Sequence, residues 1–381
     1  MRALNIVHVF RAPLGGLFRH VADLVRGQVA RGHNVGMVVD SLTGNARASE
    51  IIRELSPSLA LGVSHTPMPR PLSLLDLGAV VHVSKRLRET RADVVHGHGA
   101  KGGAYARLAV AGRRVVRAYT PHGGSLLLDH ATLKGKAYLK LEKALMSRGD
   151  LYLFESAYSA GIFRAKVGAP RGVVRVIHNG VSGGEFEPVA LSPDAADIVF
   201  VGEFRPVKGV DTLIDAIASL KREGRPLTAT LVGSGPDEAA LKAQVAQLGL
   251  DAAVHFAPAM PMREALRLGK LMALPSRAES LPYVVLETAA ADRPMITTRV
   301  GGIPEIYGPL AGSLVAPGNV PALAQAIKGA IDAPPDTRKL SKSLRARIAA
   351  SFSLDAMVEG VLSCYEQAVE ASPLLTQIIG A

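Results

Sequence analysis

Two glutamates, Glu279 and Glu287, lie eight positions apart in the segment SRAESLPYVVLETAAADRP. Pro282 suits the first turn of a helix because its missing N–H would have no partner there, and Ser280 just before it can cap the open amides. This pattern predicts a loop at Glu279 and a helix at Glu287. The positive end of such a helix attracts a phosphate or a hydroxyl-rich ring, and the two carboxylates can accept hydrogen bonds from sugar and ribose hydroxyls. The spacing therefore indicates a sugar-nucleotide site, although a solvated loop acid and a helix-surface acid would show the same spacing.

Glycine pairs and basic residues mark two further segments in the first half of the chain. Gly15 and Gly16 follow a predicted strand, where backbone amides without side chains can approach a phosphate, although a plain tight turn would also place glycines there. The segment HGHGAKGG puts His98 and Lys101 at a strand-to-helix junction. His96 and His98 have the types of metal ligands, but no nearby acid completes a set, so we predict no metal site.

Three more loops complete the pattern. His122 follows a predicted strand in TPHGGS, where a histidine that bonds a nearby carbonyl is the alternative interpretation. Arg205 and Lys208 in GEFRPVKG form a cationic pair that can neutralise a diphosphate leaving group, unless they are only a solvated charged turn. Gly233 and Gly235 in GSGP form a glycine turn whose partial pattern is weak in isolation.

The elements that must position these loops are short β-rich runs, each followed by a helical stretch. Such alternation is typical of doubly wound α/β folds, in which ligands bind beyond the carboxyl ends of parallel strands. The predicted strands are LNIVHVF, VGMVVD, DVVHGHG, RVVRAYT and DLYLF in the first half, and DIVFVGEF, TATLVGSGP, AVHFAP, KLMALPS and PMITT in the second. A length of 381 residues also favours two domains. The segment VSGGEFEPVALSPDAAD is the predicted linker between two Rossmann-like halves.

Composition limits the class of protein. Residues 1–188 hold 26 Lys and Arg against 13 Asp and Glu, a net charge of +13, whereas residues 189–381 have a net charge of −2. The first half is therefore expected to meet an anionic partner, such as a phosphorylated substrate or an acidic lipid surface. Nucleic acid is disfavoured because the chain has no Trp, only 4% aromatic residues and no nucleic-acid-binding motif.

Targeting and redox features are few. Cys364 is the only cysteine, which excludes an internal disulfide and a cysteine-based metal site. No apolar run approaches the roughly 20 residues of a membrane-spanning helix, and the start MRALNIVHVFRAPLGG lacks the features of a secretory signal. We therefore expect a cytoplasmic protein.

In order along the chain, the segments PLGGLFRHV, VVHGHGAKGG, TPHG, VIHNGV, VGEFRPVKGVDTLIDAI, LVGSGP and ESLPYVVLETAAADRPMITTRVGGIPEI resemble the retaining glycosyltransferases of family 4. The resemblance covers most of the chain and implies the GT-B fold, with two Rossmann-like domains and the active site in the cleft between them. It implies an acceptor-binding domain at 1–188, a nucleotide-sugar donor-binding domain at 189–354, and a C-terminal helix at 355–381 that crosses back to the first domain.

The resemblance also implies roles for single residues. Lys208 would bind the donor diphosphate, Glu287 the nucleotide ribose, and Glu279 the transferred sugar. The remaining donor-side residues it implies are Gly16 at the diphosphate, His122 at the sugar, the turn Ser280, Leu281, Pro282 and Tyr283, and the glycines Gly233 and Gly235. The acceptor-side residues are Gly15, His98 and Lys101. One position departs from the family pattern: Glu203 stands where an arginine usually follows VG, and the basic residue Arg205 comes two places later.

The implied reaction transfers a sugar from a nucleotide diphosphate sugar to an acceptor hydroxyl with retention at the anomeric carbon, without cofactor, divalent metal or protein nucleophile. For the acceptor we expect a lipid-linked or polysaccharide-precursor glycan. The segment LKGKAYLKLEKALMSR places Lys136, Lys140 and Lys143 opposite apolar residues, a pattern that suits contact with an acidic membrane as well as an ordinary surface helix. A GT-B sugar-nucleotide epimerase and a non-catalytic sugar-nucleotide-binding protein remain as alternatives.

Overall fold

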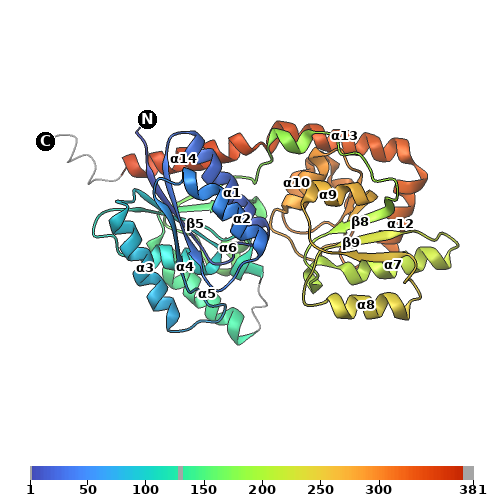
Figure 1. The fold of residues 1–381 in the computed structure, drawn as a ribbon, viewed down its shortest axis with the longest axis horizontal. Helices are drawn as coiled ribbons and strands as arrows, with labels where there is room; N and C mark the ends of the chain where they lie inside the picture. The colour runs from blue at the N-terminus through green and yellow to red at the C-terminus, as the bar shows by residue number, and fades with distance from the viewer. Residues whose placement is uncertain (1, 128–131, 372–381) are drawn as a thin grey trace. The chain divides into compact units, whose positions relative to one another are not determined.

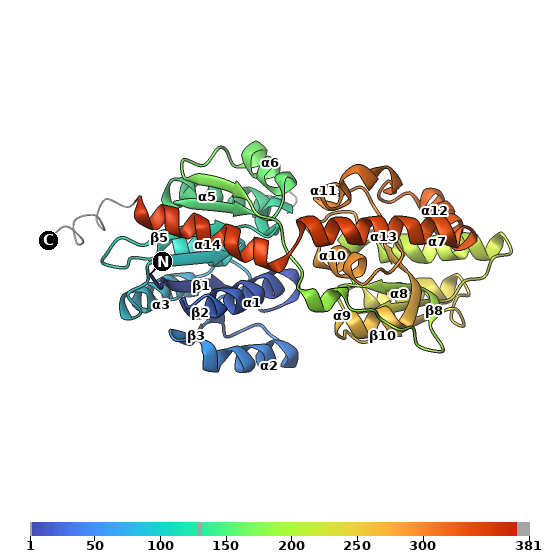
Figure 2. The same cartoon turned by 90° about the horizontal axis from the view of Figure 1, so that it is seen from above.

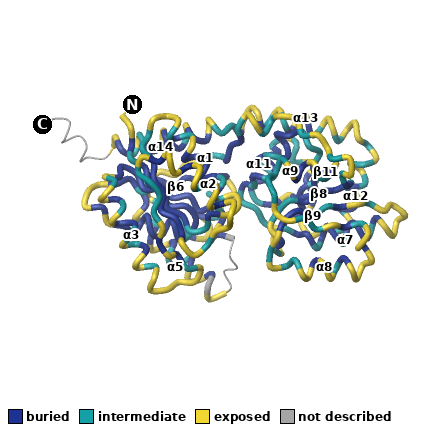
Figure 3. Tube along the Cα trace, viewed as in Figure 1, coloured by how far each residue is buried: buried dark blue, intermediate teal, exposed yellow. Residues whose placement is uncertain are grey.

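The computed structural model describes residues 2–127 and 132–371 and divides the chain into two compact units. Unit 1 contains Met1–Asn179 together with the C-terminal segment from Leu354, and unit 2 contains Gly180–Ser353. Each unit is a parallel β-sheet with helices against it (Figure 1). The central strands of both sheets are buried, while the outer sides of the surrounding helices are exposed (Figure 3).

The sheet of unit 1 has the strand order β3-β2-β1-β4-β5-β6-β7, with every neighbouring pair parallel. The chain winds outward from β1 in one direction and from β4 in the other, so the topological switch point lies between β1 and β4. The strands are β1 Asn5–Phe10, β2 Asn34–Asp40, β3 Gly62–Thr66, β4 Val94–His98, β5 Val116–Thr120, β6 Leu151–Phe154 and β7 Val173–Val176.

Helices cover both faces of this sheet (Figure 2). Ile6 of β1 packs in a core with residues of α1 and α14, whereas Val7 and Val9 pack in a core with residues of α3 and α4. The alternation follows from strand geometry, because successive side chains point to opposite faces. The helices of unit 1 are α1 Gly15–Ala30, α2 Ala46–Leu55, α3 Leu75–Glu89, α4 Gly99–Leu108, α5 Leu133–Leu145, α6 Ala157–Lys166 and α14 Leu354–Glu370.

The sheet of unit 2 has the order β10-β9-β8-β11-β12 and is also parallel throughout, with its switch point between β8 and β11. Its strands are β8 Ala196–Val201, β9 Ala229–Val232, β10 Val254–Ala257, β11 Gly269–Leu274 and β12 Met295–Thr297. Its helices are α7 Val210–Arg222, α8 Glu238–Gln247, α9 Met262–Ala265, α10 Tyr283–Ala290, α11 Ile303–Tyr307, α12 Val320–Asp332 and α13 Pro334–Ser351. One large apolar core joins this sheet to its helices.

All ten strands predicted from the sequence are present, but β3 and β7 were not predicted. These two strands form the outer edges of the unit 1 sheet. The β3 sequence GVSHT mixes polar and apolar residues, and every residue of β7 is exposed. Edge strands bury less surface, so they carry less of the apolar signal that identifies a strand in a parallel sheet.

The first unit ends at Asn179 rather than at residue 188 as predicted. Val181 belongs to the core of unit 2, Phe186 packs against that core, and the Val181 N–H donates to the Phe352 carbonyl at 2.9 Å. The apolar residues of the predicted linker therefore hold it to the second unit. The helix that returns to unit 1, α14, begins at Leu354, and residues 372–381 of the predicted third segment lie outside the described residues. Among the described helices, none has both the length and the hydropathy needed to cross a bilayer.

Candidate active site

In unit 2 the predicted chemistry gathers at the switch point between β8 and β11. The loop after β8 carries Lys208, and the loop after β11 carries Glu279. The Lys208 Nζ lies 2.7 Å from Glu279 Oε1, and the Ser276 hydroxyl donates to the same oxygen at 2.7 Å. The two side chains are 27% and 12% exposed. The structure thus joins a lysine and a carboxylate from two separate loops where parallel sheets bind ligands.

Glycines without room for a side chain fix these two loops. A Cβ on Gly209, which has a φ of 66°, would lie 2.2 Å from the Pro275 carbonyl oxygen, so the Lys208 turn packs directly on the loop after β11. A Cβ on Gly301, which has a φ of 58°, would lie 1.9 Å from the Glu279 carbonyl oxygen. Only glycine fits both the left-handed backbone and the close approach. The GGIPEI segment therefore supports the backbone of Glu279.

Arg277 holds the same loops together and was not identified from the sequence. Its backbone N–H donates to the Val207 carbonyl at 2.7 Å, and its guanidinium donates to the Pro206 carbonyl at 2.7 Å. The guanidinium also bonds both carboxylate oxygens of Asp211, at 2.8 and 2.6 Å. This two-pronged contact joins the start of α7 to the Glu279 loop. In the sequence Arg277 is only an arginine two residues before Glu279. It can be recognised as a structural residue only when Asp211 is known to lie nearby.

Glu279 lies in a loop and Glu287 in α10, as the sequence predicted, but the start of that helix differs from the prediction. Pro282 is the residue before the helix, with extended backbone at φ −73° and ψ 124°, and α10 begins at Tyr283. The helix has no side-chain cap at that residue, and the Ser280 carbonyl accepts the Gly302 N–H at 2.7 Å. Tyr283 and Leu281 are buried, so the Ser280 to Tyr283 turn is anchored by its apolar residues.

Arg205, Gly233 and Gly235 have structural partners. The Arg205 Nε lies 2.7 Å from Glu203 Oε1, so the acid that replaces the usual arginine also pairs with the arginine two places later. A Cβ on Gly233 would lie 1.9 Å from the Gly202 carbonyl oxygen, and one on Gly235 would lie 2.3 Å from that of Phe204. The GSGP turn thus packs against the loop after β8, which explains both glycines without a ligand.

The switch point of unit 1 holds a cavity of about 230 Å³ lined by residues from the loops after β1 and β4. His98 and Lys101, two of the predicted acceptor-side residues, are in its lining, together with Arg11, Arg70 and Tyr138. Lys101 donates to Asp76 at 2.5 Å and to the Pro71 carbonyl at 3.0 Å. Although burial raises the pKa of Asp76, hydrogen bonds from Lys101 and Tyr105 lower it below its ordinary value. Asp76 balances the charge of Lys101, and the lining also contains the guanidinium groups of Arg11 and Arg70, which would attract an anion.

Gly15 and Gly16 open α1 beside this cavity. Gly15 has a φ of 62°, and a Cβ there would meet nothing within 4 Å. Leu14 precedes the helix and provides no side-chain cap, which leaves the first amides of α1 to solvent or ligand. The expected approach of Gly16 to a phosphate is compatible with this geometry and remains a prediction.

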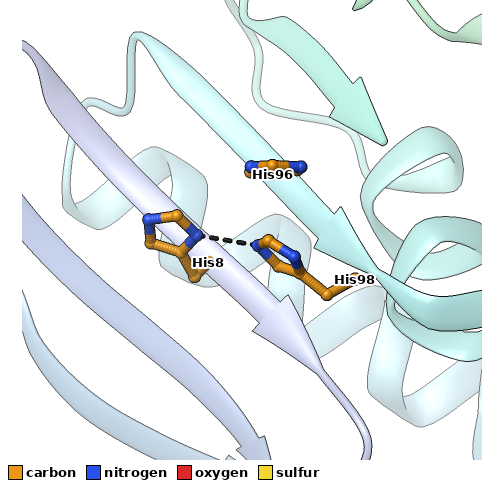
Figure 4. Close-up of side chains that lie close together, drawn as sticks. All are labelled: His8, His96 and His98. Carbon is orange, nitrogen blue, oxygen red and sulfur yellow. Dashed lines mark hydrogen bonds between the residues drawn. The ribbon is translucent and has the colours of Figure 1, made fainter. Parts of the chain in front are cut away.

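A network of buried histidines lies behind the cavity, on the face of the sheet covered by α1 and α14. On this face the side chains along β1 go from the apolar Ile6 to His8 as the strand approaches its carboxyl end. Those along β4 go in the same way from the apolar Val94 to His96 and His98. The His8 and His98 rings point toward each other from adjacent strands, with His96 beside them (Figure 4). The His8 Nδ1 lies 2.9 Å from His98 Nε2, and the His98 Nδ1 lies 3.0 Å from His122 Nε2.

The outer members of this network come from α1, α14, the end of β5 and a loop. His8 Nε2 lies 2.8 Å from Gln28 Oε1, and His20 Nδ1 lies 2.9 Å from Asn179 Oδ1. His96 bonds the Tyr365 hydroxyl at 2.5 Å and the Thr120 hydroxyl at 2.9 Å. Burial lowers the pKa of His8 and of His20 to about 4, and it lowers the pKa of His96, His98 and His122 well below the ordinary value. These imidazoles are therefore neutral at physiological pH.

His122 stands out by its backbone. It is one of three described residues other than glycine with a positive φ, at 52°, directly after β5. Such a conformation costs free energy and persists where the surroundings require it, often at functional sites. The sequence identified His96, His98 and His122 but not His8, His20, Gln28 or Asn179. The alternation of Leu4, just before β1, with Ile6 and His8 in the strand is a signal that could have placed His8 on the same face.

Comparison with known proteins identifies the family. Residues 14–182 match the family described as Glycosyltransferase Family 4, and residues 185–347 match glycosyl transferases group 1. The chain belongs to glycosyltransferase family 4. This glycosyltransferase is 25% identical to a D-inositol 3-phosphate glycosyltransferase of Jonesia denitrificans, over 95% of its own length and 93% of the relative. It is 28% identical to the enzyme of the same name from Acidothermus cellulolyticus, over 97% and 91% of the two chains.

Solved structures show that the glycosyltransferase has the GT-B fold. Sucrose-phosphate synthase of Thermosynechococcus elongatus superposes with a TM-score of 0.81 at 21% identity, over 97% of this chain and all of the other. The Anabaena protein HepE in complex with UDP-glucose superposes with a TM-score of 0.79 at 19% identity, over 96% and 100% of the two chains. The predicted fold class and family are thus confirmed.

Proposed function

We propose that this glycosyltransferase moves a sugar from a nucleotide diphosphate sugar to an acceptor hydroxyl with retention of the anomeric configuration. The observation that carries the proposal is the 2.7 Å contact between Lys208 and Glu279 across the switch point of unit 2, beside the start of α10. A cation, a carboxylate and the N-terminal end of a helix at one edge match the three parts of such a donor. The solved complex of HepE with UDP-glucose supports this class of donor.

In the proposed reaction the bond between the anomeric carbon and the diphosphate breaks while the acceptor oxygen bonds to the same face of the sugar. The departing diphosphate gains negative charge, which Lys208 and the amides at the start of α10 stabilise. Glu287 in the helix binds the ribose hydroxyls. Glu279 orients the sugar and does not act as a nucleophile in this proposal, and the bonds from Lys208 and Ser276 to its Oε1 hold the carboxylate in one orientation. No divalent metal takes part in the proposed reaction.

For the acceptor we propose a glycan that carries a phosphate or diphosphate, such as a lipid-linked precursor of a surface polysaccharide. Arg11 and Arg70 at the unit 1 cavity, together with the +13 charge of the first half of the chain, favour an anionic group. The names of the curated relatives, which contain inositol 3-phosphate, agree with a phosphorylated acceptor.

A lipid-linked acceptor would require contact with the inner face of a membrane, and unit 1 has a suitable surface. Leu74 and Leu77 at the start of α3 are 85% and 65% exposed, and Leu133 at the start of α5 is 86% exposed. On α5 the apolar residues Tyr138 and Leu145 are buried within unit 1, which leaves Lys136 and Lys140 exposed. Exposed leucines beside lysines favour an acidic lipid surface, and we propose that the enzyme works there from the cytoplasmic side.

The test is a transfer reaction with a panel of UDP-sugars and a lipid-linked diphosphate acceptor in acidic vesicles, with EDTA present. The expected product has the same anomeric configuration as the donor by proton NMR, and the protein floats with the vesicles at low salt. Inversion would exclude the retaining mechanism, and an absolute need for a divalent metal would exclude the metal-free reaction. Isomerisation of the donor without acceptor would favour the epimerase alternative.

A further inference from the structure

We propose that Gln28, His8 and His98 form a buried hydrogen-bond chain that holds His122 in the tautomer with its proton on Nε2, which leaves Nδ1 as an acceptor for a substrate hydroxyl. The three residues are positioning residues, since they act through His122. The role assigned to the Nδ1 atom rests on the proposed function, whereas the chain itself rests only on the geometry of unit 1.

The direction of the chain follows from its first member. The Gln28 Oε1 can only accept, so the proton between it and His8 lies on His8 Nε2, at an N–O distance of 2.8 Å. A neutral imidazole carries one N–H, so His8 Nδ1 must accept, and His98 donates to it from Nε2 at 2.9 Å. His98 Nδ1 must then accept from His122 Nε2 at 3.0 Å. Each ring in turn fixes the tautomer of the next.

Burial makes this sequence of bonds a strong constraint. His8 and His98 are 0% and 1% exposed, and Gln28 is 0% exposed. The desolvation that lowers the pKa values of these rings keeps each imidazole neutral near pH 7. No ring therefore gains a second proton, which would break the order of donors and acceptors in the hydrogen-bond chain. A reversed tautomer of His122 would place two N–H groups or two bare nitrogens face to face in the interior, at the cost of an unsatisfied buried group.

The same rings could be read as metal ligands, because the nitrogens of His8, His96 and His98, and those of His20, His98 and His122, lie within 4.8 Å of one another. The separations favour hydrogen bonds. Two imidazole nitrogens on one tetrahedral zinc ion, each at about 2.0–2.1 Å, stand roughly 3.3 Å apart. The 2.9 and 3.0 Å separations in the chain are those of hydrogen bonds. Neither group contains a carboxylate to balance a buried dication.

The hydrogen-bond chain ends at His122, a residue whose backbone is also constrained. With a φ of 52° after β5, the residue is committed to one backbone conformation, and the bond to His98 fixes the ring as well. The His20 ring lies edge-on at 4.7 Å between centroids, so a second neutral imidazole restricts the ring further. His122 therefore presents its Nδ1 as a defined acceptor. A fixed acceptor suits recognition of a hydroxyl better than a ring that exchanges freely between tautomers would.

The test reads the tautomer directly by nitrogen-15 NMR of the histidine rings in the full-length protein without substrate. We expect His122 to be neutral with its proton on Nε2 near pH 7. Gln28→Met removes the first acceptor while keeping a side chain of similar length, and it should produce a mixture of His122 tautomers. In the transfer assay it should lower kcat by about tenfold, the effect of losing one hydrogen bond of ordinary strength, with a smaller change in the donor KM.

Tyr152→Phe is the matched control, because it removes a buried hydroxyl of unit 1 that bonds the Met146 carbonyl at 2.7 Å, and it should leave the His122 tautomer unchanged. A proton on His122 Nδ1 in the unmodified protein would overturn the proposal, even if Gln28→Met did not fold. Stoichiometric uptake of Zn²⁺ with displacement of the Nε2 proton would overturn it in favour of a metal site. A fixed tautomer in a protein that transfers no sugar would leave the chain intact and reject the proposed function instead.

Discussion

Glu279 shares one carboxylate oxygen between two donors, the Lys208 ammonium and the Ser276 hydroxyl, both at 2.7 Å. Bonds of this kind hold the carboxylate in one orientation. In the proposed reaction the departing diphosphate needs a cation nearby, and Lys208 is the residue to which we give this role. Under the proposal the pair separates the task of stabilising the leaving group from that of orienting the sugar.

Glu279→Gln tests this division at the level of one residue. The amide keeps the shape of the side chain and one acceptor oxygen, so we expect kcat to fall by about 10- to 100-fold, the effect of weakening a charge-assisted hydrogen bond. The remaining product should retain its anomeric configuration. A loss on the order of a million-fold would instead be typical of a nucleophile, and would contradict the role given to Glu279. Glu238→Gln, in an exposed ion pair with Lys242, is the control and should leave kcat unchanged.

At this scale the sequence identified the candidate residues, whose roles stay predictions, and missed those that hold them in place. Lys208 and Glu279 were visible because the family pattern preserves their local spacing. Arg277 and Asp211 are 66 positions apart, and His8 and His98 are 90 positions apart. A supporting contact of this kind depends on which strands are neighbours, and no local pattern records that.

At the scale of elements, the site consists of loops that glycines hold against one another. Gly209 brings the loop after β8 onto Pro275, and Gly301 brings the GGIPEI segment onto Glu279. These approaches are between backbone atoms, so no side-chain rearrangement can make room for a Cβ. The element pattern itself was predictable because buried parallel strands are continuous apolar runs, whereas the edge strands β3 and β7 lacked that signal.

Gly301→Ala should therefore damage both stability and activity. The added Cβ would lie 1.9 Å from the Glu279 carbonyl oxygen and would stand at a φ of 58°. We expect the free energy of unfolding to fall by about 2–4 kcal/mol in urea denaturation, and transfer to fall with it because the Glu279 backbone must move. Gly312→Ala is the matched control, since a Cβ there meets nothing within 4 Å, and it should change stability by no more than about 0.5 kcal/mol. Equal effects of the two variants would show that the close approach does not support the loop.

At the scale of the whole molecule, the described buried histidines are divided unequally between the two units. Unit 1 buries His8, His20, His96 and His98, whereas the one histidine of unit 2, His255, is exposed. Burial lowers the pKa of His8 from 6.5 to about 4 in the folded protein. Below pH 6.5 the unfolded chain therefore binds protons that the folded chain does not, and stability falls as the pH drops toward 4.

This difference predicts that acid weakens unit 1 before unit 2. Hydrogen exchange should show that amides of β1 and β4 lose protection between pH 6.5 and 4, while those of β8 and β11 keep theirs, after correction for the intrinsic rates. The carboxylates with lowered pKa, Asp76 and Asp197, titrate below this window and do not disturb the comparison. Parallel loss of protection in both units would contradict the assignment of neutral buried histidines.

The central claim, that unit 2 binds a nucleotide diphosphate sugar through Lys208, is tested most directly by thermal unfolding of the protein with a panel of nucleoside diphosphates and their sugars. A ligand that binds only the folded state raises the melting temperature with its concentration, by a free energy of about 2.7 kcal/mol at 100 times Kd. We predict that at least one nucleoside diphosphate stabilises the protein, that Lys208→Ala removes most of this shift, and that Lys242→Ala, at an exposed ion pair, retains it. A protein that responds to none of these ligands, or whose response survives Lys208→Ala unchanged, would contradict the claim.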